Sequence, residues 1–89
     1  MTDERLQALY DHLAATGERP VERTASRWLG EAEAVAADIA EGDISADVLA
    51  ERLATVDHIL SQVAGTGDAV ADDHVEAARE IVDDLLAEQ

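Results

Sequence analysis

The sequence predicts an all-α fold: a single helical-bundle domain over residues 1–89, built as a compact antiparallel bundle of three or four helices. Four segments carry apolar residues at helical spacing, and none shows the alternation typical of a strand. Short links containing glycine separate most of these segments, and short links favour antiparallel neighbours. With 89 residues and no cysteine, the domain depends on helix packing, self-association or a solvent that favours compaction.

The first two helices are predicted over residues 3–15 and 20–41. The first begins at Thr2 or Asp3, and a Thr-Gly pair ends it in the manner of a C-terminal cap. Pro20 suits the first turn of the second helix. The apolar face of the first helix comprises Leu6, Leu9, Tyr10 and Leu13. The predicted inward face of the second comprises Val21, Ala25, Trp28, Ala32, Val35, Ala36 and Ile39.

The third and fourth helices are predicted over residues 46–64 and 70–88. Ser45 is placed to cap the third helix. Asp68 and Asp73 can each start the fourth, and Asp73 is favoured because a glutamate follows it three residues later, as in an acidic capping box. The apolar face of the third helix comprises Leu49, Leu53, Val56, Leu60 and Val63. That of the fourth comprises Val75, Ala78, Ile81, Val82, Leu85 and Leu86.

Charge is the strongest feature of the composition. The chain has 21 acids and 6 bases, all of them arginine, for a net charge of −15. Such charges repel one another at ordinary salt, whereas molar salt shortens the Debye length to about 3 Å. Residues 1–30 hold five acids and four arginines (−1), and residues 31–89 hold sixteen acids and two arginines (−14). Because carboxylates keep a surface hydrated, we expect a protein adapted to high salt.

The sequence predicts neither a membrane segment nor a leader peptide. Its N-terminus lacks a basic region followed by a long apolar run. Its apolar stretches fall far short of the ~20 residues that cross a bilayer. We therefore expect a cytoplasmic protein without membrane contacts.

Three Asp-His pairs are the raw material of metal or general-base sites: Asp11-His12, Asp57-His58 and Asp73-His74. At about 100° per residue, His58 points to solvent, His12 lies on a flank, and only His74 falls near a buried face. Metal sites in bundles use inward Glu and Glu-x-x-His residues, and the sequence contains no Glu-x-x-His. We therefore expect the pairs not to converge, and we predict no metal, cofactor or catalytic residue and hence no enzyme.

The second helix carries a candidate partner-binding surface, which comprises Arg19, Arg23, Arg27, Gly30, Ala34 and Ala37. Arginines recurring every four residues could bind phosphate, nucleic acid or an acidic partner, and small side chains let another helix approach closely. Alternatively, the arginines pair with acids of the same chain, and Gly30 is a tolerated surface residue. The net charge of −15 opposes nucleic-acid binding, which makes a protein partner the stronger expectation.

Two resemblances bear on function. The turn Ile39-Ala40-Glu41-Gly42-Asp43-Ile44-Ser45 resembles the helical hairpin of the exonuclease VII small subunit, over about residues 35–63. That resemblance implies an accessory subunit of a nucleic-acid-processing enzyme and transfers no functional residue. In composition, the whole chain resembles the small, functionally uncharacterised acidic helical proteins of haloarchaea, which implies no activity.

From these observations we expect a non-enzymatic protein–protein interaction or accessory module. Its expected partner is another protein or a second copy of the chain. The alternative is the accessory subunit that the exonuclease VII resemblance implies.

Overall fold

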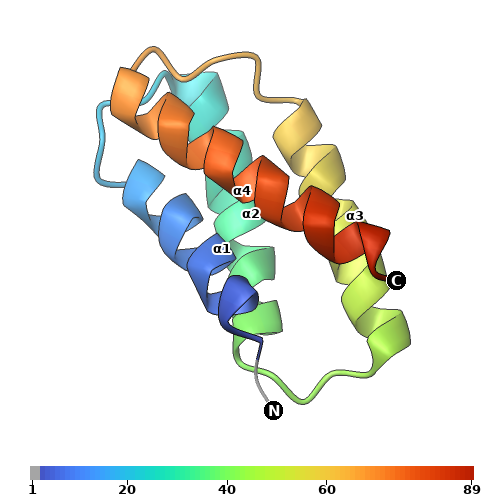
Figure 1. Ribbon diagram of the computed structural model, residues 1–89. Helices are drawn as coiled ribbons and strands as arrows, with labels where there is room; N and C mark the ends of the chain where they lie inside the picture. Colours follow the sequence, from blue (N-terminus) through green and yellow to red (C-terminus); the bar gives the residue numbers. More distant parts are fainter. Residues whose placement is uncertain (1–2) are drawn as a thin grey trace.

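The computed structural model describes residues 3–89, which form four helices: α1 (Glu4–Thr16), α2 (Arg23–Ala40), α3 (Ala46–Ser61) and α4 (Ala69–Ala87) (Figure 1). Within this part of the chain there is no strand. The all-α prediction is confirmed, with four helices rather than three. Thr2, the alternative start of the first helix, lies outside the described residues, and Asp3 caps α1 by accepting a hydrogen bond from the backbone of Arg5.

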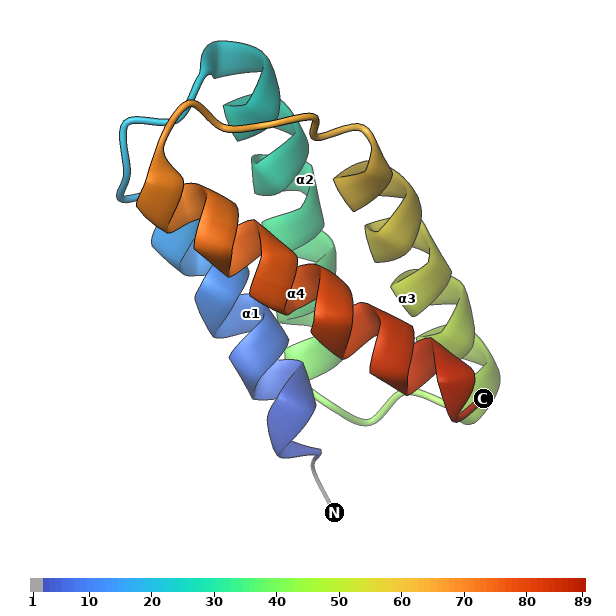
Figure 2. The same ribbon diagram turned by 45° about the horizontal axis from the view of Figure 1, so that its top comes forward.

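The four helices run alternately up and down the bundle and close into a ring (Figure 2). Each helix contacts the next along the chain, and α4 returns to pack against α1 as well as α3. The domain measures 35 × 19 × 18 Å, with a radius of gyration of 12.2 Å. This radius is what a compact chain of this length has. Each helix therefore keeps one face toward the centre and one toward solvent.

The core is a single cluster of small and medium aliphatic side chains. Its fully buried members include Leu9, Leu13, Leu53, Leu60 and Val82. On α2 the buried positions are Ala25, Leu29, Ala32, Ala36 and Ile39. The sequence prediction missed one buried position of this face, Leu29. The predicted Val21, Trp28 and Val35 are half-buried and pack against the core. The five buried positions of α2 are spaced by four, three, four and three residues, so the buried face passes through Leu29 rather than Trp28.

Capping residues determine where α2 and α4 begin, and in both helices the capping residue differs from the predicted start signal. The α2 helix begins at Arg23 rather than Pro20, because the Glu22 carboxylate accepts hydrogen bonds from the backbone N–H groups of the first turn. The α4 helix is capped by Asp68, whose carboxylate accepts from the N–H of Ala71 at 3.0 Å. The preference for Asp73 as the cap was therefore wrong, whereas the predicted range 70–88 agrees with α4 to within one residue. In α3, the predicted Ser45 cap is confirmed by its bond to the Val48 N–H.

The links at the two ends of the bundle are held in place by specific contacts. At one end the α1–α2 and α3–α4 links lie side by side (Figure 1), joined by a 2.7 Å hydrogen bond from the Glu22 N–H to the Thr66 carbonyl. At the other end, Gly42 takes a positive φ of 83° in the turn that leads from α2 to α3. None of the four helices is long and apolar enough to span a bilayer.

Candidate interaction surface

Arg19 does not belong to the surface predicted for the second helix. It lies in the α1–α2 link, where its Nε and Nη2 atoms donate to the two carboxylate oxygens of Asp68 at 2.9 and 3.1 Å. This fork-like pairing holds the pKa of Asp68 below its ordinary value and raises that of Arg19. Arg19 thus ties the start of α4 to the α1–α2 link, and for this residue pairing within the chain is the correct interpretation.

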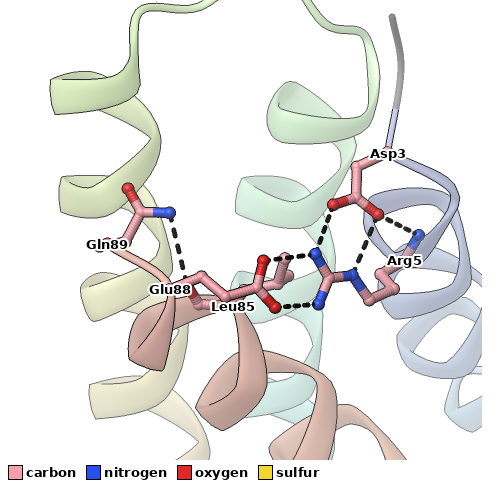
Figure 3. Close-up of polar contacts among 5 residues, drawn as sticks. All are labelled: Asp3, Arg5, Leu85, Glu88 and Gln89. Atoms are coloured by element: carbon pink, nitrogen blue, oxygen red, sulfur yellow. Dashed lines mark hydrogen bonds and ion pairs between the residues drawn. The ribbon is translucent and has the colours of Figure 1, made fainter.

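Two other arginines also form hydrogen bonds within the chain that stabilise the fold. Arg5 donates to Asp3 at 2.8 Å and to both carboxylate oxygens of Glu88 (Figure 3), which joins the start of α1 to the end of α4. Arg79 donates to the carbonyls of Leu60 and Val63 at 2.7 and 2.6 Å. It thereby satisfies carbonyl groups at the C-terminal end of α3.

The remaining arginines are Arg23, Arg27 and Arg52, and all three are exposed. None of them forms an ion pair with any residue between 3 and 89. Arg52 stands on α3, whereas Arg23 and Arg27 are neighbours on successive turns of α2. The predicted row of three arginines therefore loses its first member, Arg19, and its other two members remain available to a partner.

The small residues of the predicted surface, like its arginines, do not all lie on the exposed side of α2. Gly30 and Ala34 are exposed, and a Cβ atom added at Gly30 would meet nothing within 4 Å. Neither residue is covered by another helix of this chain. Ala37 is half-buried and faces α1, where it lines a hollow of about 230 Å³ beside Gln7 and Tyr10. Ala37 thus leaves the candidate surface.

The exposed side of α2 continues beyond Ala34 with two acids that the sequence analysis did not include. We call the complete row the outer face of α2; it comprises Arg23, Arg27, Gly30, Ala34, Asp38 and Glu41. All six are exposed, and Glu41 is the C-cap residue of the helix. Their spacing of four, three, four, four and three residues keeps them within about 40° of the direction opposite the core. The same periodicity that finds a buried face would have found this row.

Charge on the outer face has a definite order: two arginines at the N-terminal end, small residues in the middle, and two carboxylates at the C-terminal end. A helix N-terminus carries partial positive charge and its C-terminus partial negative charge. The α2 helix has no acid in its first turn and no base in its last. The outer face is therefore arranged against the preference of its own helix.

The positions of two of the three histidines differ from the prediction. His12 on α1 and His74 on α4 meet, with 2.9 Å between their Nδ1 atoms and 5.2 Å between ring centres. The expectation that the Asp-His pairs do not converge is wrong for these two, whereas His58 is exposed as predicted. One Nδ1 must carry a hydrogen and the other a lone pair for this bond to form. The pair provides two imidazoles, and zinc sites use three or four protein ligands.

The aspartates of the three Asp-His pairs do not extend the pair of imidazoles into a larger site. Asp11 accepts a hydrogen bond from the Gln7 side chain at 2.9 Å, and Asp57 and Asp73 are exposed. Within residues 3–89 no three His, Cys, Asp or Glu side chains are placed to hold a metal ion together.

A hollow of about 510 Å³ opens between the α3–α4 link and α4. Its walls include Arg79 and the carboxylates Asp72, Glu76, Glu80 and Asp83. Because Arg79 already donates to two backbone carbonyls, the charged groups that remain available to a ligand in this hollow are the negative carboxylates.

Comparison with known proteins places the domain in a family. The sequence matches a domain of unknown function, DUF8152, over residues 5–89. The chain belongs to the DUF8152 family. Comparisons with curated proteins and with solved structures give no significant match. The DUF8152 match extends over all four helices, so the outer face of α2 and the His12–His74 contact both lie inside the family's domain.

Proposed function

We propose that this DUF8152 domain is a non-enzymatic protein–protein interaction module that associates with itself through the outer face of α2. The observation that carries the proposal is the charge order of that face: two arginines without ion pairs, a flat centre and two carboxylates on one exposed line. In a chain of net charge −15, positive groups left without partners are scarce. Arginine is also among the residues enriched at protein interfaces.

The centre of the face supports the same proposal. A glycine inside a helix is about 1 kcal/mol less favourable than alanine. Gly30 has open space around its missing side chain, so no contact within the chain requires it. A helix from another molecule could approach the backbone closely at this point, because Ala34 one turn later is equally small.

A nucleic-acid partner, as in the accessory-subunit alternative, finds less support. With Arg19 paired to Asp68, the outer face offers two arginines. Two phosphate contacts supply little of the electrostatic affinity that nucleic-acid binding needs. The carboxylates at the other end of the same face would repel phosphate.

The proposed association belongs to a concentrated salt solution, as in the cytoplasm of a salt-accumulating cell. Two copies of net charge −15 repel each other strongly at low salt. Molar salt shortens the Debye length to about 3 Å and removes most of that repulsion, while groups in direct contact still attract each other. Self-association should therefore strengthen between low salt and molar potassium chloride.

Amide chemical shifts measured at increasing protein concentration in molar potassium chloride test this proposal. We expect concentration-dependent shifts that concentrate between Arg23 and Glu41 and fade in Arg27→Glu. Arg52→Glu is the matched control, because it reverses an equally exposed and unpaired arginine on α3. Shifts confined to other helices, or no change up to the solubility limit, would contradict the proposal.

A further inference from the structure

We infer that the outer face of α2 pairs with the same face of a second copy in an antiparallel, two-fold symmetric dimer. This inference rests on the proposed self-association and adds the geometry of the pair. A two-fold contact brings the same patch of both copies together, so the patch must be complementary to itself. The outer face of α2 meets that condition in one orientation only.

The positions along α2 define the register. Arg23 and Glu41 each lie nine residues from position 32, and Gly30 and Ala34 each lie two residues from it. The two-fold axis then passes the outer side of α2 at the height of position 32. Arg23 of one copy lies opposite Glu41 of the other, and Gly30 lies opposite Ala34. Arg27 falls within one residue of Asp38 of the second copy.

The opposite orientation is excluded by charge. In a parallel pair the arginines of both copies would meet at one end and the carboxylates at the other. Like charges placed directly opposite each other at an interface are strongly unfavourable. The antiparallel pair instead forms opposite-charge contacts at both ends. It also places the two helix dipoles side by side in opposite directions.

The antiparallel pair also accounts for the order of charges that opposes the α2 dipole. The arginines near the N-terminus of α2 are brought beside the C-terminal end of the second α2, where cations are favoured. The carboxylates near the C-terminus are brought beside the other N-terminus, where anions are favoured. An arrangement that is unfavourable in one helix thus becomes favourable in two.

The centre of the contact permits close approach. Packed helices lie 8–10 Å apart depending on the side chains between them. Gly30 opposite Ala34 favours the short end of that range, and a Cβ at Gly30 meets nothing from its own chain within 4 Å. One pair of helices buries less than the roughly 1,200–2,000 Å² of standard interfaces, so the dimer is reversible.

Charge reversal on the outer face tests the orientation. In the first variant, Arg23→Glu/Arg27→Glu, all four charges of the face are negative; in the second, Asp38→Arg/Glu41→Arg, all four are positive. Each variant alone opposes like charges and should dimerise at least ~tenfold more weakly in sedimentation equilibrium at molar salt. The fourfold variant that combines all these changes reverses the face and regains self-complementarity, so its dimerisation should return.

Mixing supplies the decisive comparison. The fourfold variant should not form the antiparallel pair with the wild-type chain, because that mixed pair opposes like charges at both ends. Circular dichroism verifies that each variant remains helical, and Arg52→Glu controls for charge reversal at an exposed arginine outside the face. If both double variants are monomeric and the fourfold variant stays monomeric, the antiparallel geometry is wrong although the face still binds. If the double variants dimerise like the wild type, both the geometry and the proposed self-association through this face fail.

Discussion

Thr66 offers a sharp test of how the DUF8152 bundle is held together at one end. It is a fully buried polar residue, in the link between α3 and α4. Its hydroxyl donates to the Asp72 carboxylate at 2.7 Å and accepts from the Asp68 N–H at 3.1 Å. Its carbonyl accepts from the N–H of Glu22 in the α1–α2 link. One side chain therefore organises the start of α4 where two links meet.

Thr66→Val keeps the shape of the side chain and removes the hydroxyl. Each lost hydrogen bond is worth about 0.5–1.5 kcal/mol, and more when the partner is charged. Two such bonds involve the buried hydroxyl, which gives an expected loss of about 2–3 kcal/mol. For a domain of this size, that corresponds to a fall in Tm of roughly 10–20 °C. The backbone contact with Glu22 remains, so the overall fold should persist.

Thermal unfolding in molar potassium chloride, followed by circular dichroism, measures this effect. Thr55→Val is the matched control: Thr55 is exposed on α3, and its hydroxyl donates to the carbonyl of Glu51 in the same helix. Its Tm should change by no more than a few degrees, as for ordinary surface substitutions. If Thr66→Val lowers the Tm no more than Thr55→Val does, the hydroxyl does not organise this end of the bundle.

Three further predictions concern stability. Leu13→Ala should lower the free energy of unfolding by about 2–5 kcal/mol, because Leu13 is fully buried; urea titration measures this, and a loss below about 1 kcal/mol would contradict the core packing. Hydrogen bonds lower the pKa of Asp72, chiefly from the Thr66 hydroxyl, and that of Glu22, chiefly from the Thr24 N–H. Carboxyls with a lowered pKa stabilise the fold above their ordinary values of 3.8 and 4.5. Stability in molar salt should therefore fall as pH drops through and below that range, and a constant Tm there would refute the role of these bonds. Finally, Tm should rise steeply from low salt to molar potassium chloride, and a flat Tm would remove the basis for adaptation to high salt.

The periodicity of the sequence was sufficient to predict the fold class and all four helices. Helix boundaries were harder, because Asp68 and Asp73 are both good cap residues and only the tertiary contacts distinguish them. Asp68 is held by Arg19 from the other link and by the buried Thr66 beside it. The contact with Arg19 joins residues 49 positions apart, and no local pattern reveals it.

The candidate surface was predicted in part, for a related reason. Arginine spacing suggested one row from Arg19 to Arg27, but Arg19 lies outside the helix and makes an ion pair. Asp38 and Glu41 have the right periodicity, yet in a chain with 21 acids they do not stand out. The contact between His12 and His74 was missed because angles around separate helices do not give distances between helices.

The most direct test of the antiparallel α2 pair uses the absence of cysteine from the chain. Disulfides form only when the two Cα atoms lie about 4.4–6.8 Å apart. Gly30→Cys and Ala34→Cys are mixed in equal amounts at molar salt under mild oxidation, with Ala54→Cys on the exposed side of α3 as the control. The antiparallel pair predicts that the mixed disulfide between positions 30 and 34 forms faster than either same-position disulfide and faster than the control. A mixed disulfide that forms no faster than the one at position 54 would contradict it.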